Sequence, residues 1–154
     1  MKASSASSRR ARSRSPRSDD AGLRQPFTNF RFRVAIEGLS STGAVGVVFP
    51  TARIVTVARK RRVVQFDPLV IRRGLTLSTE WYDWWNQVRR SSRAPRRDVQ
   101  VILLDSNGVD ALRWVYPDSM PLSYSLSPLN ALVGEALIES LELRVGEFDL
   151  YRAE

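Results

Sequence analysis

The sequence predicts a mainly β fold, a sandwich-like or barrel-like domain of about seven or eight strands with one short α-helix. Runs in which apolar and polar residues alternate recur from residue 26 onwards, and a turn signal separates them roughly every ten residues. A single stretch, from Ser78 to Arg90, places its apolar residues at helical spacing instead. Short strands with regular turns are typical of sandwiches and barrels.

Composition limits what this domain can do. The 154 residues favour one domain, and a hydrophobic content of 43% is enough for a core. The sequence has no cysteine and no histidine, which excludes disulfides, thiolate nucleophiles and the commonest zinc ligand and general base. It also has no phosphate-cradling or dinucleotide-binding motif and no stretch long enough to span a membrane. We therefore expect no enzymatic activity, no cofactor, no metal site and no stable membrane insertion.

Residues 1–25 are predicted to form a basic arm, separate from a β domain over residues 26–154. The arm holds seven of the 24 lysines and arginines but only two of the 16 acidic residues, so it carries +5 of the net charge of +8. It is rich in serine and has too few apolar residues to fold alone. Three interpretations of this segment remain open. It is a flexible arm that docks on a partner, or it is a nucleic-acid-binding tail, or it is a targeting peptide that is cleaved off. The arginines expected to dock are Arg9, Arg10, Arg12, Arg14 and Arg17.

The first strands follow the arm. Residues 30–36 alternate between apolar and polar, as in a half-buried strand. After a turn over residues 38–43 comes an apolar run in which Gly46 suggests a β-bulge or a close backbone approach.

Residues 54–66 predict a hairpin with a charged tip. Its tip is the basic cluster Arg59, Lys60, Arg61 and Arg62. Cations at such a tip are usually solvated or protect an edge strand from unwanted pairing. The alternatives are contact with the acidic surface of a partner and contact with nucleic acid.

The predicted helix has one strongly apolar face. Trp81, Trp84, Trp85 and Val88 occupy positions i, i+3, i+4 and i+7. The dipeptide Ser78-Thr79 offers an N-cap hydroxyl, and two arginines in the last turn suit the negative end of the helix dipole. We expect the tryptophan face to plug the core of the β-sheet.

The second half of the chain predicts a tight hairpin and a long final strand. Residues 99–116 contain two apolar runs that flank Asn107-Gly108, a strong turn signal because both residues tolerate positive φ. Residues 134–150 predict one long strand in which Glu139 lies on the same face as the apolar residues. The alternative is a helix, since Leu137, Ile138 and Leu141 also fit one helical face.

Several short motifs occur in consistent order over residues 26–148. They are NFRFRVAIEG at the first strand, IRRGLT before the helix, WYDW at its start, RDVQVILLDSNG in the hairpin, RWVYPDSMP after it, and LNALVGEALIESLEL near the end. Through these motifs the sequence resembles the tail tube proteins of contractile phage tails and contractile injection systems.

This resemblance implies a structural function. Family members form hexameric rings that stack into a hollow tube, and each subunit contributes strands to a ring-wide β-barrel. The implied partners are identical subunits, adjacent rings, the sheath, and baseplate or hub proteins, with nucleic acid reached only through the lumen or the arm. The implied location is a phage tail or injection particle assembled in the bacterial cytoplasm. The residues expected at ring-stacking and assembly contacts are Arg59, Lys60, Arg61, Arg62, Asn130, Glu135 and Glu139.

Two features depart from the family pattern. The loop that clasps a neighbour is short and basic here, over residues 50–67, and the Ser/Arg-rich arm is additional. The chain therefore belongs either to the bulk tube or to a specialised layer, such as the first ring on the baseplate. The alternative function is a nucleic-acid-binding β-barrel with a basic tail, which needs aromatic side chains exposed beside cations. Only residues 30–33 have that composition, and a strand sends its Phe and Arg side chains to opposite faces.

Overall fold

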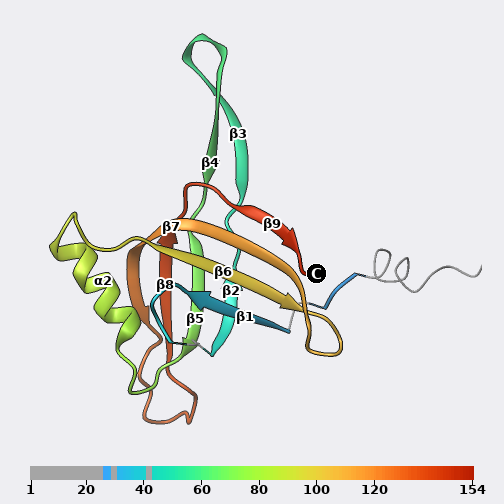
Figure 1. Cartoon of the computed structure of the whole chain (residues 1–154). Coiled ribbons are helices and arrows are strands. Elements are labelled where there is room, and N and C mark those ends of the chain that lie inside the picture. The colour runs from blue at the N-terminus through green and yellow to red at the C-terminus, as the bar shows by residue number, and fades with distance from the viewer. Residues whose placement is uncertain (1–25, 29–30, 41–42) are drawn as a thin grey trace, which may run out of the picture.

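The computed structural model describes residues 26–28, 31–40 and 43–154, so the predictions for the arm and for Phe30 fall outside this part of the chain. The described part contains nine strands and one α-helix, which confirms the mainly β class with one short helix (Figure 1). The strands are β1 (Phe32–Ile36), β2 (Ala44–Val48), β3 (Ala52–Val57), β4 (Arg61–Phe66), β5 (Leu69–Gly74), β6 (Arg97–Leu104), β7 (Asp110–Leu126), β8 (Ile138–Arg144) and β9 (Asp149–Arg152). The α-helix is α2 (Glu80–Arg90), and a 3₁₀ turn, η1 (Ala58–Lys60), joins β3 to β4.

Seven strands form one antiparallel sheet that folds over the core. The hydrogen-bonded order is β1-β6-β7-β8-β5-β2, and β9 also pairs with β7. β7 belongs to both halves of this sheet, because its first part pairs with β6 and β9 whereas its second part pairs with β8. Among the described residues, β3 and β4 pair with each other and with no third strand.

A bulge in the middle of β7 allows this change of partner. The pairing with β6 shifts register where Pro117 and Asp118 lie opposite Asp98. Asp118 has a φ of 50°, and its N–H donates a 3.0 Å hydrogen bond to Oδ1 of Asp98. A bulge of this kind bends the strand that carries it. Figure 1 shows β7 curving from the β6 side of the sheet towards β8.

The core lies between the two halves of the sheet and the helix. Alternate residues of β1, β5, β6 and β8 point into it, as the period-two pattern predicts. The largest fully buried side chains are Trp81, Trp84, Tyr116, Leu69, Ile71, Leu141 and Leu143. α2 packs at one end of the sheet, so its two buried tryptophans close that end of the core (Figure 1).

The turn between β6 and β7 combines the predicted glycine with an aspartate that the pattern did not single out. Gly108 has a φ of 77°, whereas Asn107 stays outside the left-handed region. Oδ1 of Asp105 accepts hydrogen bonds from the backbone N–H of Asn107 at 2.8 Å and of Val109 at 3.0 Å. This Asx turn satisfies two loop amides that would otherwise face only water. The predicted bulge at Gly46 is confirmed by the register shift between Ala44 and Gly46.

Two local predictions are wrong. The final segment is not one strand, because β8 and β9 pair with different parts of the bent β7 and residues 145–148 separate them. Thr79 stands at the N-cap position of α2 but makes no side-chain capping bond there. Its hydroxyl donates to Oδ2 of Asp83 at 2.8 Å, and this orientation of the side chain leaves the N-terminal amides of the helix without a bond to it.

Replacing Gly108 with alanine tests whether backbone strain governs the β6–β7 turn. We expect Gly108→Ala to lower the free energy of unfolding by about 1–2 kcal/mol, because a Cβ disfavours positive φ. No heavy atom lies within 4 Å of the added Cβ, so a loss reports strain rather than a clash. Gly134→Ala is the matched control, since that site has the same open space without a positive φ. Equal losses in urea titrations of the two variants would contradict this explanation.

Candidate assembly surfaces

The hairpin of β3 and β4 stands away from the sheet (Figure 1). Its strands pair over six residue pairs, which corresponds to a length of about 20 Å. Ile54 and Val64 lie opposite each other on it and are 71% and 54% exposed. A two-stranded hairpin is marginally stable by itself in water, and exposed apolar side chains are typical of contact surfaces. The hairpin is therefore the strongest candidate for a surface that another molecule covers.

The tip of the hairpin concentrates positive charge. The side chains of Arg59, Lys60, Arg61 and Arg62 are all exposed, and within the described residues none of them forms an ion pair. Arg59 and Lys60 have φ values of 63° and 60°, a left-handed conformation that residues other than glycine seldom adopt. Strained backbone of this kind occurs preferentially at functional sites.

The base of the hairpin is tied to the body of the protein. Arg53 and Asp67 form a two-pronged ion pair across it, with N–O distances of 3.2 and 3.1 Å. The ring of Phe66 contacts that of Phe148 edge to face at 6.0 Å, and Phe148 contacts the buried Tyr116 at 5.6 Å. This chain of aromatic contacts joins the projecting hairpin to the core.

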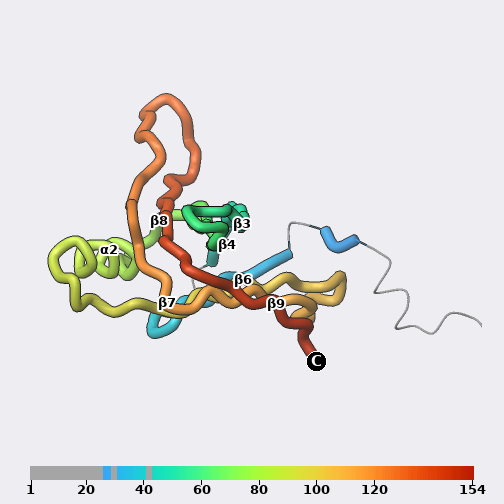
Figure 2. The backbone as a smooth tube through the Cα atoms, turned by 90° about the horizontal axis from the view of Figure 1, so that it is seen from above, coloured from blue at the N-terminus to red at the C-terminus, as the bar shows by residue number. Residues whose placement is uncertain are grey.

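A second exposed surface lies in the loop over residues 127–137, between β7 and β8. Figure 1 places this loop at the end of the molecule away from the hairpin tip, and Figure 2 shows it extending beyond the strands. Leu129 and Leu132 are 86% and 95% exposed. Asn130 and Glu135 are exposed here as well, and Oδ1 of Asn130 accepts a 2.9 Å bond from the Leu132 N–H. The loop borders a hollow of about 340 Å³.

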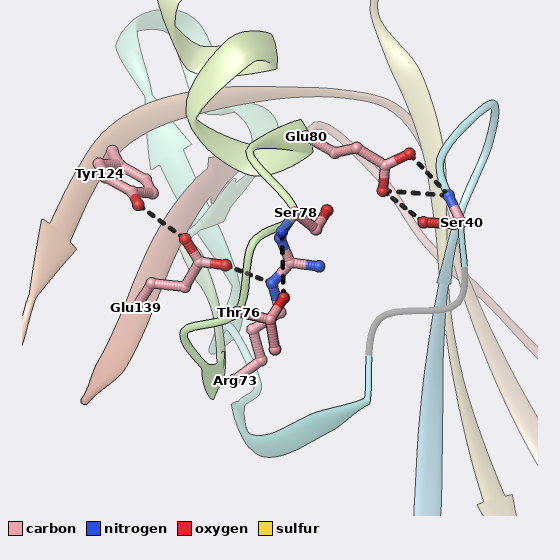
Figure 3. Close-up of polar contacts among 7 residues, drawn as sticks. All are labelled: Ser40, Arg73, Thr76, Ser78, Glu80, Tyr124 and Glu139. Atoms are coloured by element: carbon pink, nitrogen blue, oxygen red, sulfur yellow. Dashed lines mark hydrogen bonds and ion pairs between the residues drawn. The ribbon is translucent and has the colours of Figure 1, made fainter. Parts of the chain in front are cut away.

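Glu139 lies elsewhere. It is 1% exposed, and its Oε1 accepts a hydrogen bond from Nε of Arg73, which is 4% exposed (Figure 3). Its other oxygen accepts a 2.7 Å bond from the hydroxyl of Tyr124. A carboxylate so deeply buried cannot reach a neighbouring ring, which contradicts the expected stacking role of Glu139. The parity of the strand pattern placed this residue correctly on the core face, and the resemblance assigned it the wrong role.

The buried pair connects the sheet to the helix. The guanidinium carbon of Arg73 lies 4.3 Å from the ring centroid of Trp81, an arrangement suited to a cation–π interaction. Burial, together with the hydrogen bond and charge of Glu139, raises the pKa of Tyr124 to about 12. Tyr124 therefore remains a hydrogen-bond donor throughout the physiological range.

The start of the helix is tied to the turn after β1. The carboxylate of Glu80 accepts a 2.6 Å bond from the hydroxyl of Ser40 and 3.3 Å contacts from its backbone N–H (Figure 3). These bonds, the hydroxyl first, hold the pKa of Glu80 below its usual value. The negative charge also lies in the first turn, at the positive end of the helix dipole.

The predicted tryptophan face divides into a buried and a half-buried part. Trp81 and Trp84 are fully buried, whereas Trp85 and Val88 pack against the core from its rim. Trp84 Nε1 donates a 2.9 Å hydrogen bond to the carbonyl of Pro95, so the helix end and the following loop are held together. This face acts within the fold, and its aromatic rings do not form an open binding platform.

Two kinds of site are absent from the described residues. No group of three or more Asp or Glu side chains there is placed to hold a metal ion. Across the same residues, no helix is both long and apolar enough to cross a membrane.

A family model described as T4-like virus tail tube protein gp19 matches residues 28–149, which is most of the chain. The chain belongs to this family of tail tube proteins. No curated protein sequence matches it.

Solved structures share the fold of this tail tube protein. A chain in the cryo-EM structure of an extracellular contractile injection system, the PVC sheath-tube complex in its extended state, has a TM-score of 0.69 at 15% identity, over 90% of this chain and 100% of that one. A chain of the anti-feeding prophage baseplate, 6-fold symmetrised, gives 0.60 at 17%, over 83% and 97%. Hcp1 from Flavobacterium johnsoniae gives 0.61 at 15%, over 80% and 97%.

Sequence reasoning missed part of the candidate surface of this tail tube protein. Among the leucines that the structure describes, Leu129 and Leu132 are the most exposed besides Leu77, yet the pattern gave them no role. The available signal was the run PLNALVG, in which apolar residues occur between a proline and a glycine rather than in an alternating strand. An apolar loop bounded by turn residues lies outside the strands that bury their own apolar face, and so belongs among candidate contact surfaces.

The contribution of the buried Arg73–Glu139 pair to the stability of this tail tube protein can be tested by removing one partner or both. Glu139→Ala leaves the charge of Arg73 buried without its carboxylate, and we expect it to lower the free energy of unfolding by about 3–5 kcal/mol. The double variant Arg73→Met/Glu139→Leu should recover most of that loss, because it removes both charges together. Urea titration followed by tryptophan fluorescence measures all three proteins.

The exposed pair at the hairpin base provides the control. Asp67→Ala breaks the ion pair to Arg53, whose two side chains are 47% and 48% exposed, and should cost no more than about 1 kcal/mol. A Glu139→Ala loss as small as that of Asp67→Ala would show that Arg73 reaches water when its partner is gone.

Proposed function

We propose that this tail tube protein forms a hexameric ring of the inner tube of a phage tail or contractile injection system, with the β3–β4 hairpin as its ring-stacking element. The observation that carries the proposal is the hairpin itself. It extends away from the sheet, it exposes apolar side chains along its length, and four adjacent cations occupy its tip. In a free monomer the hairpin, its apolar side chains and its cations all face water. In a stack of rings, the adjacent ring covers the hairpin and its apolar side chains and supplies partners for the cations.

The hairpin meets the loop over residues 127–137 of a subunit in the adjacent ring. The two surfaces lie at opposite ends of the molecule in Figure 1, as a head-to-tail contact requires. Both expose aliphatic side chains, and the loop supplies Asn130 and Glu135 as an acceptor and an anion for the cationic tip. Repeated through successive rings, this heterologous contact builds an open-ended tube.

Neighbours within a ring join through strand edges. Among the described residues β2 has one strand partner, β5, and β9 has one, β7. Exposed edges invite pairing with another chain, and closing a barrel removes them. Each subunit thereby lends strands to one ring-wide β-barrel. A baseplate structure with a chain of this fold was symmetrised six-fold, which supports a six-subunit ring.

The surrounding partners are other rings, a sheath, and baseplate or hub proteins. The solved structures of similar fold come from a sheath-tube complex, a baseplate and a tube-terminating cap, so one fold serves several layers. The ring works by geometry and contact rather than by catalysis, and it assembles in the bacterial cytoplasm. The basic arm, with Arg9, Arg10, Arg12, Arg14 and Arg17, docks on one of these partners and decides between the bulk tube and a baseplate-proximal layer.

Nucleic-acid binding by the barrel itself is the weaker alternative. Phe32 packs against the core and Arg33 is exposed, forming an ion pair with Asp110 at 2.6 Å. Phenylalanine and arginine therefore occupy opposite faces of β1, and no stacking platform forms there. Contact with nucleic acid remains a role for the lumen or the arm.

Charge reversal at the hairpin tip tests the stacking contact. We expect Arg59→Glu/Arg61→Glu/Arg62→Glu to fold normally and to form rings, but to reduce the fraction of protein in tubes by about tenfold or more, because opposed charges would become like charges. Negative-stain imaging and light scattering measure the tubes, and circular dichroism measures the fold. The variant Arg59→Lys/Arg61→Lys/Arg62→Lys keeps the charge and should keep the tubes. If the Glu variant forms as many tubes as the unmodified protein, the hairpin tip is not part of the stacking contact.

Removing the arm tests its control over assembly. We expect the chain without residues 2–25 to keep its secondary structure and to form longer tubes, because each subunit loses a strongly cationic segment that repels its copies. Image-based length distributions at low and high salt give the comparison. If the full chain gives tubes of the same length, the arm does not limit stacking. Tubes that vanish without the arm would make it an assembly contact.

A further inference from the structure

Five arginines lie within nine residues at the end of α2 and in the loop that follows. They are Arg89, Arg90, Arg93, Arg96 and Arg97, and no acidic residue occurs between Asp83 and Asp98. The two cations in the last helical turn suit the negative end of the helix dipole, but Arg93 and Arg96 lie beyond its reach. The helix therefore explains only part of this charge.

The fold uses two of the five side chains. Nη1 of Arg97 donates a 2.9 Å hydrogen bond to the carbonyl of Glu37, and its guanidinium carbon lies 5.7 Å from the Trp84 ring centroid. Nε of Arg89 donates a 3.0 Å bond to Oδ1 of Asn86, and its guanidinium lies over Trp85 at 5.5 Å. Both side chains stabilise the packing of the helix against the sheet.

The other three form what we name the basic ridge, Arg90, Arg93 and Arg96. All three are exposed, and within the described residues none of their side chains makes a hydrogen bond or an ion pair. Arg96 shares the rim of a hollow of about 320 Å³ with Asp118, Glu147 and Arg144, two acids and one further cation. The local charge is thus balanced at one end of the ridge and left positive at Arg90 and Arg93.

The ridge is remote from the surfaces already assigned. Figures 1 and 2 show α2 and the following loop projecting at one side of the molecule, away from the β3–β4 hairpin and from the C-terminus. The proposed stacking contact and the strand edges of β2 and β9 do not include these arginines. The ridge is therefore available to a molecule other than the adjacent ring.

The chemistry of the ridge suits a carboxylate surface better than single-stranded nucleic acid. A guanidinium binds a carboxylate or a phosphate through two parallel hydrogen bonds. Binding of single-stranded nucleic acid adds aromatic rings on which bases stack. Residues 86–97 contain no aromatic side chain. In the preceding turns Trp81 and Trp84 are buried, and Trp85 lies beneath Arg89. Tyr82 is 40% exposed, but its ring packs against Trp85 at 6.1 Å and Tyr124 at 5.7 Å. We propose that the basic ridge is a docking surface for an acidic face of a protein that surrounds the tube.

This inference rests on the proposed tube function, and binding of a defined acidic probe tests it. The full chain is titrated into a fluorescent deca-glutamate peptide and, separately, into fluorescent single-stranded dT20. We expect Arg90→Gln/Arg93→Gln/Arg96→Gln to weaken peptide binding about tenfold or more at low salt. The matched variant Arg72→Gln/Arg144→Gln/Arg152→Gln loses the same charge from exposed arginines on three separate strands and should weaken it less than about threefold. A lysine version of the ridge should lose part of the affinity, because lysine keeps the charge without the bidentate geometry.

Two results would contradict the proposal that the ridge binds an acidic protein surface. Equal losses in the ridge variant and in the variant of the three strand arginines would mean that the peptide senses only total charge. A larger loss for dT20 than for the peptide would identify nucleic acid as the partner. Imaging separates this inference from the tube function, since the ridge Gln variant should still form tubes. Ridge-dependent binding in a protein that never assembles would refute the tube proposal alone, and tubes lost in the ridge variant would place the ridge inside a ring contact.

Discussion

The ion pair between Arg73 and Glu139 joins parts of the chain that are far apart in sequence. It links β5 to β8, the Tyr124 hydroxyl adds β7, and the stacking of Arg73 on Trp81 adds the helix. Nη2 of Arg73 has no partner within the described residues, so the network is not completely satisfied. A buried ion pair of this kind contributes little net stability over apolar packing, but removing only one of its two partners is strongly destabilising because the other charge stays buried. Its effect here is geometric, because only one placement of α2 on the sheet lets all four side chains meet.

The position of α2 in turn determines what remains exposed. With its tryptophans directed into the core, the opposite side of the helix and its C-terminal loop face outward with their arginines. The bend in β7 has a similar consequence, since it carries β8 and β9 along different parts of one strand and brings Phe148 beneath the hairpin. Both the arginine-bearing side of α2 and the β3–β4 hairpin are therefore positioned by contacts that also build the core.

Local patterns predicted the elements better than their connections. Period-two alternation identified β1 and β8, and helical spacing identified α2, because burial of one face imposes these periods wherever an element packs. The division of the last segment into β8 and β9 follows from the bulge in β7, a nonlocal cause that no window of sequence contains. Glu139 is a second case in which the local sequence does not contain the cause. Its parity indicated the core, but only the partner on β5, 66 residues earlier, explains why a carboxylate is tolerated there. The basic ridge was visible as a run of arginines, yet separating structural cations from free ones required their contacts.

Charge also constrains how copies of this chain can stack. A symmetric contact between two hairpin tips would bring eight cations together, since each tip carries four. Like charges at short range repel, so a tip must instead meet a surface of different character. The loop over residues 127–137 is apolar, carries Glu135 and lies at the other end of the molecule. Such a contact is heterologous, and every ring must then point in the same direction. With the proposed stacking contact, the polarity of the tube would follow from the sign of the charge at one turn.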